Sequence, residues 1–156
     1  MTERARRDRL TGLPNLAAWA EALETERMRR SRYRRPVVVM SVDVDGLERI
    51  NRRFGRSTGD ELLVATARIL RANLRDADLV ARTGPDEFGV LMPETNAEAM
   101  GPIVARVSEA AAAWRGTNPE ARLSLSVGWA VPEPFGALGR AQHAAAEQVR
   151  LTKRGA

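Results

Sequence analysis

Two acidic residues stand side by side at a predicted turn, and they are the first candidates for chemistry. Asp86 and Glu87 follow Gly84 and Pro85, two residue types that favour tight turns, and short apolar runs flank this segment on both sides. The pattern predicts a β-hairpin with two carboxylates at its tip. A hairpin tip is also exposed to water, so for an arbitrary hairpin the charges would need no functional explanation.

A second acidic pair makes a functional site the better interpretation. Asp43 and Asp45 end the apolar run 37–45, whose β-branched residues predict a central strand buried on both faces. Side chains alternate along a strand, so both carboxylates point to one face. A carboxylate inside such a strand is costly unless a cation or a metal pairs with it. Two acidic strand ends that converge would suit Mg²⁺ and a triphosphate, with Asp43 as the strongest candidate ligand.

Composition sets the outer limits of the prediction. The chain has 156 residues, of which 44% are hydrophobic and 29% charged, as in a single soluble globular domain. It contains no cysteine and one histidine, His143, which excludes disulfides and thiolate metal sites and argues against a histidine-rich zinc site. No run approaches the ~20 apolar residues of a membrane span. The basic N-terminus lacks the apolar core of a signal peptide, and we expect a cytoplasmic protein.

Arginine dominates the positive charge. The net charge is +5, and Lys153 is the one lysine. The densest basic stretch runs from Arg27 to Arg35, just before the first predicted strand. Such a stretch could contact nucleic acid or an acidic membrane face. It contains a single aromatic residue, Tyr33, and no groove-reading motif, so we expect no nucleic-acid binding and interpret the stretch as a solvated helix end.

Periodicity and turn signals predict the elements that position these residues. Helices are expected at 16–30, 46–53, 96–114 and 138–150, and strands at 37–45, 79–81, 90–92 and 123–130. Thr58 and Glu61 have the spacing of a capping box and predict the start of a further helix, which Leu63 to Leu74 continue with one buried face. The order of elements predicts an α+β fold with one mostly antiparallel sheet flanked by helices.

Several short motifs keep a common register along the chain. They are Arg7 to Asn15, Val42 to Gly46, Ile50-Asn51, Phe54-Gly55, Gly59 to Glu61, Arg82 to Phe88 and Leu125 to Gly128. Together they resemble the GGDEF domain of the diguanylate cyclase family. The segment Gly84-Pro85-Asp86-Glu87-Phe88 occupies the position of the family's signature motif, in a degenerate form. The resemblance implies a nucleotidyl-cyclase-like, polymerase-palm-like fold. It also implies a single GGDEF-like domain over residues 1–156, with a core of about 7–154 and no sensor domain.

The resemblance implies a reaction as well. The family makes cyclic di-GMP and pyrophosphate from two GTP molecules, each held by one domain of a homodimer. Asp43, Asp86 and Glu87 are implied as catalytic residues, and together with the carbonyl of Val44 as the ligands of Mg²⁺ (or Mn²⁺). Such a metal offsets the charge of the triphosphate, lowers the pKa of the attacking hydroxyl and aligns it for in-line displacement.

Three further groups of residues follow from the same resemblance. Asn51 and Asp60 would bind guanine, although an acid at a helix start, such as Asp60, is also favoured by the helix dipole alone. The phosphate contacts would come from Gly84 and Lys153. An allosteric site for cyclic di-GMP is implied at three residues on and beside an Arg-x-x-Asp motif, namely Arg75, Asp78 and Arg106.

Other positions depart from the family pattern. Pro85 replaces the second glycine of the signature and removes an N–H, and Glu48 stands where a phosphate-binding lysine is usual. In the last helix Val149 replaces a lysine, with Arg150 as its only nearby substitute and one position away. Arg56 also replaces a frequent histidine. These departures predict that cyclase activity is weak or lost.

Three functional interpretations remain open from the sequence. The first is a slow diguanylate cyclase, and the second is a non-catalytic domain that binds GTP or cyclic di-GMP and acts on a partner protein or sensor domain. The third is a purely structural or interaction domain that retains the fold.

Overall fold

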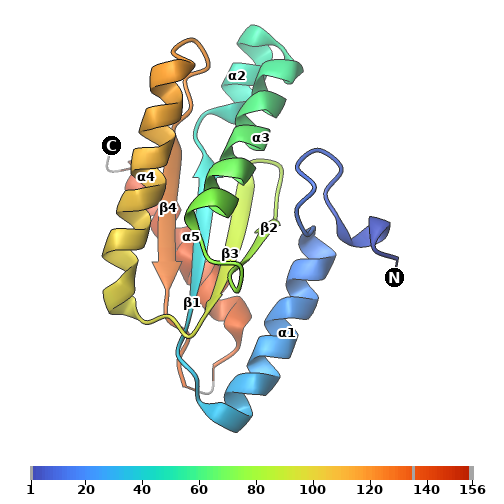
Figure 1. Ribbon diagram of the computed structural model, residues 1–156, viewed down its shortest axis with the longest axis vertical. Coiled ribbons are helices and arrows are strands. Elements are labelled where there is room, and N and C mark those ends of the chain that lie inside the picture. Colours follow the sequence, from blue (N-terminus) through green and yellow to red (C-terminus); the bar gives the residue numbers. More distant parts are fainter. Residues whose placement is uncertain (1, 135, 155–156) are drawn as a thin grey trace.

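The computed structural model describes residues 2–134 and 136–154 of the chain. Four strands form one antiparallel sheet in the order β2-β3-β1-β4, with helices on both faces (Figure 1). The elements are α1 (Leu16–Tyr33), β1 (Val37–Val44), α2 (Leu47–Phe54), α3 (Arg56–Asn73), β2 (Leu79–Arg82), β3 (Glu87–Pro93), α4 (Met100–Thr117), β4 (Leu125–Ala130) and α5 (Leu138–Arg154). Short 3₁₀ turns, η1 (Arg4–Arg6) and η2 (Ala97–Ala99), precede α1 and α4. The expected α+β class and antiparallel sheet are confirmed.

Strand β1 is the centre of the fold. It pairs with β3 on one side and with β4 on the other, and Asp43 is its one residue that is not fully buried. Successive side chains point to opposite faces, so β1 supplies two separate hydrophobic clusters. The cluster with α2, α3 and α4 takes Val38, Met40, Val42 and Val44, and the cluster with α1 and α5 takes Val37 and Val39. Asp43 has the same parity as Val37 and Val39 and therefore lies on the α1 and α5 face.

Two glycines allow helices to lie unusually close to the sheet. A Cβ atom on Gly128 of β4 would be 2.3 Å from the backbone oxygen of Ala145 in α5. A Cβ atom on Gly89 of β3 would be 2.9 Å from the ring of Trp19 in α1. Trp19 itself is almost completely buried. These contacts hold α1 and α5 against one face of the sheet, which determines where the C-terminal end of α5 lies.

The structure corrects the predicted capping box. Helix α3 begins at Arg56, with Gly55 as its N-cap at φ +94°, and Thr58 lies inside the first turn. The hydroxyl of Thr58 donates to the backbone oxygen of Phe54 instead of capping a helix start. The prediction is wrong because Gly55 alone separates α2 from α3, since its left-handed φ permits a break that no other residue type adopts easily.

Smaller differences concern the ends of the elements. Helices α1 and α5 extend to Tyr33 and Arg154, beyond the expected residues 30 and 150, and β4 begins at Leu125 instead of 123. Strand β1 ends at Val44, so Asp45 lies just after it. Across the described residues, no helix combines the length and the apolar character that crossing a membrane requires.

We predict that Gly128→Ala destabilises the fold by about 2 kcal/mol, because the new methyl group meets backbone atoms of α5 that cannot move without shifting the helix. Urea unfolding followed by circular dichroism measures the effect. The matched control is Gly101→Ala at the start of α4, where a Cβ atom meets nothing within 4 Å. Equal unfolding midpoints for Gly128→Ala and the wild type would contradict the close packing of α5 on β4.

Candidate functional site

The end of β1 and the β2–β3 hairpin bring the predicted acids to one edge of the sheet. Asp43 is paired with Glu87 in the antiparallel register of β1 and β3, so the two side chains lie on the same face. The backbone N–H of Val44 donates to the oxygen of Asp86 at 2.9 Å. The register therefore places all three acids within one short stretch, as the sequence predicted.

Lys153 from α5 contacts Asp43 and its neighbour Asp45. Its Nζ atom donates to Oδ2 of Asp43 at 3.0 Å and lies 3.4 Å from Oδ1 of Asp45. Its side chain is 34% exposed, against 19% for Asp43 and 28% for Asp45, so the contacts are only partly screened by water. From the family resemblance Lys153 was expected to contact phosphate, and this ion pair was not predicted.

Arg150 stands one position from Val149, which takes the place of the usual lysine, and its side chain is directed away from the acidic cluster. Its Nε atom lies 3.6 Å from Glu147 on the exposed side of α5. Val149 is buried, which explains why an apolar residue stands there. Lys153 is four residues further along α5, about one helical turn, and supplies the cation that Arg150 does not.

Ser126 of β4 and Ser124, the residue just before that strand, both donate hydrogen bonds to the carboxyl of Asp45. The hydroxyl of Ser124 donates to Oδ2 of Asp45 at 2.8 Å, and that of Ser126 donates to Oδ1 at 2.7 Å. The backbone N–H of Asp45 donates to the oxygen of Ser124 at 2.8 Å. Both serines alternate with apolar residues, so the sequence pattern identified a strand but not their contact with an acid.

The electrostatics of the cluster favour a bound cation. Burial raises the pKa of Asp43, and the charges of Asp86 and Glu87 raise it further, while the hydrogen bond and charge of Lys153 act in the opposite direction. Burial lowers the pKa of Lys153, but its contacts with Asp43 and Asp45 outweigh this and leave the pKa above its ordinary value. Lys153 thus contacts two carboxylates, Asp43 and Asp45, while Asp86 and Glu87 add negative charge near Asp43.

The hairpin tip is tied down by Arg82. Its guanidinium donates to the backbone oxygens of Gly84 (3.3 Å) and Pro85 (2.8 Å) and also pairs with Asp8 at 3.1 Å. The carboxyl of Glu87 accepts from the hydroxyl of Thr83 at 2.7 Å. Burial raises the pKa of Asp8, but its hydrogen bonds with Thr11 and the charge of Arg82 bring the net pKa below the usual range. Neither Arg82 nor Asp8 was expected from the sequence to have this role.

The chemistry of the acidic cluster suits a hard divalent ion, because carboxylate and backbone oxygens are the ligands that Mg²⁺ prefers. The side chains are, however, already engaged: Asp43 by Lys153, and Glu87 by Thr83. Within residues 2–134 and 136–154, no three acidic, histidine or cysteine side chains converge closely enough to hold a metal as they stand. Oxygen donors are present, and a metal would require Lys153 to move aside.

The predicted guanine pair lies on α2 and α3, which cover the other face of the sheet but follow directly after the end of β1 that carries Asp43. Asn51 on α2 packs so closely on α3 that a Cβ atom at residue 59 would be 1.7 Å from its Oδ1 atom, which explains Gly59. That Oδ1 atom is buried and has no hydrogen-bond partner. Asp60 follows on α3, is partly exposed, and lines a cavity of about 860 Å³ between α3 and α4.

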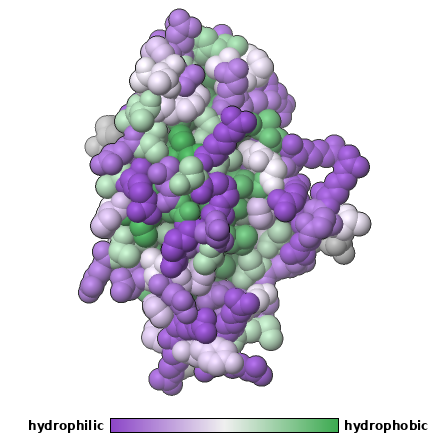
Figure 2. Space-filling view, in the orientation of Figure 1, coloured by the Kyte–Doolittle hydropathy of each residue, from purple (hydrophilic) through white to green (hydrophobic). Residues whose placement is uncertain are grey.

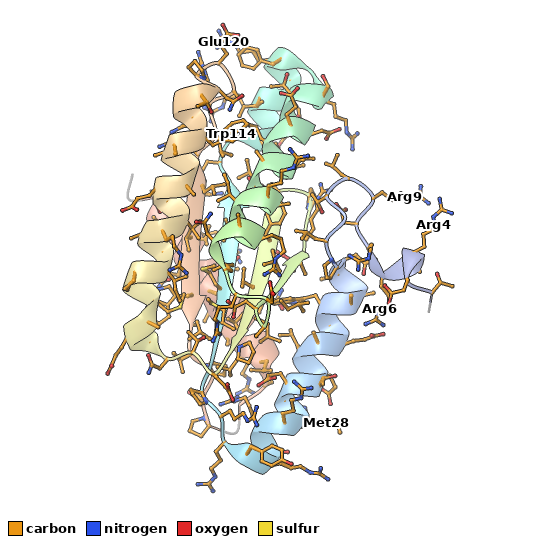
Figure 3. The ribbon with its side chains drawn as sticks, in the orientation of Figure 1. Arg4, Arg6, Arg9, Met28, Trp114 and Glu120 are labelled. Atoms are coloured by element: carbon orange, nitrogen blue, oxygen red, sulfur yellow. The ribbon has the colours of Figure 1, made fainter. Side chains whose placement is uncertain are left out.

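This cavity is an open groove rather than a closed pocket for one base. It runs along α3 beside Trp114 of α4, which Figure 3 labels, and Figure 2 shows hydrophobic side chains scattered among hydrophilic ones there. Asn51 does not line it. The structure therefore brings Asn51 and Asp60 to adjacent helices but does not enclose them in one cavity.

The Arg-x-x-Asp motif forms a compact turn after α3. The carboxyl of Asp78, which is 2% exposed, accepts from the backbone N–H of Arg75 and from its guanidinium at 2.8 Å. Arg75 also donates to the oxygen of Pro93 and the hydroxyl of Thr95. Its hydrogen bond to Asp78 is the main reason that the pKa of Arg75 is raised. Its guanidinium is half-exposed but already has three acceptors.

Arg106 of α4 lies near the same helix end, because its Nε atom donates to the backbone oxygen of Asn73 at 2.9 Å. Pro85 and Glu48 are both exposed, at the hairpin tip and on α2. Both departures from the family pattern are therefore at the surface, where a ligand could meet them.

Comparisons with known proteins agree with this fold. The family model "Diguanylate cyclase, GGDEF domain" matches residues 5–154. The diguanylate cyclase DgcP of Pseudomonas aeruginosa is 44% identical over 111 residues, which are 71% of this chain and 16% of DgcP. The probable diguanylate cyclase DgcC of Escherichia coli is 36% identical over 129 residues, 82% of this chain and 35% of DgcC. The matched part of this chain therefore spans about a sixth of the length of DgcP and about a third of the length of DgcC.

Solved structures give the same result. The diguanylate cyclase SiaD of Pseudomonas aeruginosa, in complex with its activator SiaC, matches with a TM-score of 0.86 and 29% identity over 98% of this chain and 60% of that one. The coiled coil and GGDEF domain of DgcB from Caulobacter crescentus, in complex with c-di-GMP, has a TM-score of 0.90 at 21% identity, over 98% of this chain and 83% of that one. The latter likeness concerns the fold alone.

We predict that Lys153→Met lowers the free energy of unfolding at pH 7 in EDTA by about 0.5–1 kcal/mol, a value reduced for the screening of a partly exposed pair. Asp43 has a raised folded pKa, so its contribution is most favourable below its unfolded pKa and is lost as the pH rises through the folded pKa. Without Lys153 the pKa of Asp43 is raised further, so more stability is lost as the pH rises. Urea unfolding should give a clear difference between variant and wild type at pH 7 and a smaller one at pH 3.

Arg150→Met is the matched control, because it removes an exposed cation from the same helix. A variant that lost equal stability at pH 3 and pH 7 would show that Lys153 acts through packing instead of through the acids.

Proposed function

The chain belongs to the GGDEF domain family of diguanylate cyclases. From that premise we propose that it binds GTP beside Asp43, Asp86 and Glu87 and converts it slowly to cyclic di-GMP. The observation that carries the proposal is the cluster at the end of β1, where a partly buried acid meets the acids of the hairpin tip and a lysine from α5. Excess negative charge there is suited to a divalent ion, and the lysine is suited to a phosphate.

Mg²⁺ or Mn²⁺ would be held by the carboxyls of Asp43 and Asp86 and the carbonyl of Val44, with Glu87 completing the acidic group. When bound, such an ion offsets the charge of the triphosphate and lowers the pKa of the attacking hydroxyl. The oxygen-only donor set supports this choice of metal. The bond from Thr83 to Glu87 and the hydrogen bonds from Arg82 to the tip support a hairpin that is preorganised for the ligand.

Lys153 would contact the phosphates in the same step that frees Asp43 for the metal. Its Nζ atom is 3.0 Å from the carboxyl that it would leave, so a short side-chain movement suffices. Gly84 at the hairpin tip would let the main chain approach the nucleotide. Because one lysine replaces the usual set of cations, the hold on the triphosphate is weak and the expected rate is low.

Asn51 and Asp60 would recognise guanine. Asp60 can accept hydrogen bonds from the N1–H and the exocyclic amine of guanine, a pattern that adenine does not offer. The buried, unpartnered Oδ1 atom of Asn51 supports a site that is completed by a ligand or a small rotation of the amide. The open groove beside Asp60 leaves room for the base at the end of α3.

The reaction needs two domains. In this proposal each protomer of a homodimer holds one GTP, and the 3′-hydroxyl of each GTP attacks the α-phosphorus of the other. Two new P–O bonds form, and two pyrophosphates leave. The product could act on a partner protein or on a sensor domain of a longer chain.

A second candidate function is binding of cyclic di-GMP at Arg75 and Asp78, with help from Arg106. The half-exposed guanidinium of Arg75 and the nearby Arg106 support it. The ligand would have to compete with Asp78, Pro93 and Thr95 for the same guanidinium. We therefore place this candidate second.

We predict that the purified protein forms cyclic di-GMP slowly from GTP with Mg²⁺ or Mn²⁺, and that Asp43→Asn abolishes the product. Glu48→Lys should raise the rate about fivefold, because reversing a charge near a triphosphate at a wet ~4 Å is worth about 1 kcal/mol. Chromatography of the nucleotides measures all three. Asp76→Asn, an exposed acid beside the Arg-x-x-Asp turn, is the control that should leave the rate unchanged.

The absence of product from both the wild type and Glu48→Lys would overturn the catalytic proposal and leave the binding function. Product from Asp43→Asn at the wild-type rate would remove Asp43 from the site.

For the second candidate we predict that Arg75→Ala weakens cyclic di-GMP binding at least fivefold and also lowers stability by about 2 kcal/mol, because buried Asp78 then loses its charged partner. Calorimetry and urea unfolding measure the two effects separately. Arg106→Ala is the companion variant, since its loss should reduce affinity with little change in stability. Affinity that is unchanged in both variants would exclude this allosteric site.

A further inference from the structure

The basic stretch at the end of α1 forms a cavity that the proposed function does not use. The cavity has a volume of about 270 Å³ and is lined by Arg30, Arg34, Arg35, Pro36, Pro132 and Pro134. It lies where α1 ends and β1 begins, against the loop between β4 and α5, at the lower end of the view in Figure 1. Pro36 precedes β1 and Asp43 is near its far end, so the length of the strand separates this cavity from the acidic cluster.

Arg30 has fewer partners than its chemistry requires. A guanidinium carries five N–H donors. The Nη2 atom of Arg30 donates to the backbone oxygen of Glu133 at 3.1 Å, while its Nε atom is buried and has no acceptor. None of the carboxylates described in the structure lies within ion-pair distance of Arg30. A buried donor without an acceptor costs free energy, so this arginine is in an environment that an added anion would complete.

The rest of the cavity wall adds positive charge and no acid. Arg35 reaches outward to Glu94 at 3.1 Å, and its guanidinium lies 5.5 Å from the centre of the Tyr33 ring, so it is held at the rim. Arg34 has a left-handed backbone at φ 48° and ends the helix by donating its N–H to Arg30. The three prolines contribute no backbone N–H. The side chains that line this space are therefore arginines and prolines, and the only hydrogen-bond donors these side chains carry are guanidinium groups.

A purely structural explanation covers only part of this arrangement. Basic residues at a helix C-terminus are favoured by the helix dipole, which accounts for arginines in the last turn of α1. It does not account for a buried Nε atom that faces no acceptor. Figure 2 shows that hydrophilic side chains cover this end of the molecule, and Met28, labelled in Figure 3, lies on the part of α1 that leads to it.

We propose that this cavity binds a phosphate group through Arg30, with Arg35 at the rim. A phosphate dianion has enough oxygens for more than one planar guanidinium, whereas a carboxylate is satisfied by one. The volume is below the roughly 300–1,000 Å³ of sites for drug-sized ligands. The site therefore suits a phosphate with a small attached group, and the phosphate can come from a soluble ester or from a phospholipid headgroup. This site is independent of the cyclase proposal.

The test is a titration of the full chain with inorganic phosphate at constant ionic strength, with chloride as the balancing anion, followed by calorimetry and by the unfolding temperature. Wild type should bind saturably and unfold at a higher temperature in phosphate. Arg30→Gln should weaken binding at least fivefold, and Arg30→Lys, which keeps the charge but not the planar fork, should give an intermediate affinity. If Arg30→Gln fails to fold, as judged by circular dichroism, Arg35→Gln carries the same test.

Two controls separate this site from others. Arg32→Gln removes an exposed arginine from the same helical turn that does not line the cavity, and it should bind phosphate as the wild type does. Lys153→Met removes the cation of the acidic cluster and should leave the Arg30-dependent part of the binding unchanged, which distinguishes the cavity from phosphate binding at that cluster. Equal weakening in Arg30→Gln and Arg32→Gln would overturn the proposal, because it would show that only the general positive charge matters.

The source of the phosphate is decided by two further probes. Glycerol 3-phosphate represents a soluble ester, and vesicles with phosphatidic acid, compared with vesicles of phosphatidylcholine, represent a lipid headgroup. Arg30-dependent binding to either probe supports the site and identifies the source. No saturable binding to inorganic phosphate, to the ester or to the acidic vesicles overturns it.

Discussion

The partly buried carboxylate of Asp43 is the constraint on which the rest of the structure depends. It occupies the only position of β1 that is not fully buried, in a strand whose other residues form two hydrophobic clusters. Burial and two neighbouring acids raise its pKa, and a nearby cation opposes that shift because it favours the charged form. In this structure the cation is Lys153, carried by the helix that packs on the same face.

The placement of that lysine depends on the close contact between α5 and β4. Gly128 removes the side chain that would keep α5 away from the sheet, and the helix then runs far enough to bring its last turn to the end of β1. Serines 124 and 126 hold Asp45 in place beside it. A backbone contact in the middle of α5 thus determines the electrostatics at its C-terminal end.

The fold gives its arginines different numbers of hydrogen-bond acceptors. Arg75 is satisfied by Asp78 and two further acceptors, and Arg82 by Asp8 and the hairpin oxygens, so each stabilises a turn. Arg30 at the end of α1 has one backbone acceptor and a buried Nε atom without a partner. Charge alone does not distinguish these arginines. The difference is the number of acceptors that the fold brings to each guanidinium, and it separates structural arginines from one that is suited to a ligand.

The sequence by itself determined the class of fold, the order of the elements and the position of the acids. The apolar run before Asp43 and the turn residues Gly84 and Pro85 are local signals, and local signals suffice for strands and turns. It could not determine that Asp43 pairs with Lys153, that Gly55 rather than Thr58 opens α3, or that Arg30 lacks an acceptor. Only the tertiary structure decided these points, because each depends on which distant backbone or side-chain atoms packing brings within about 3 Å of one polar group.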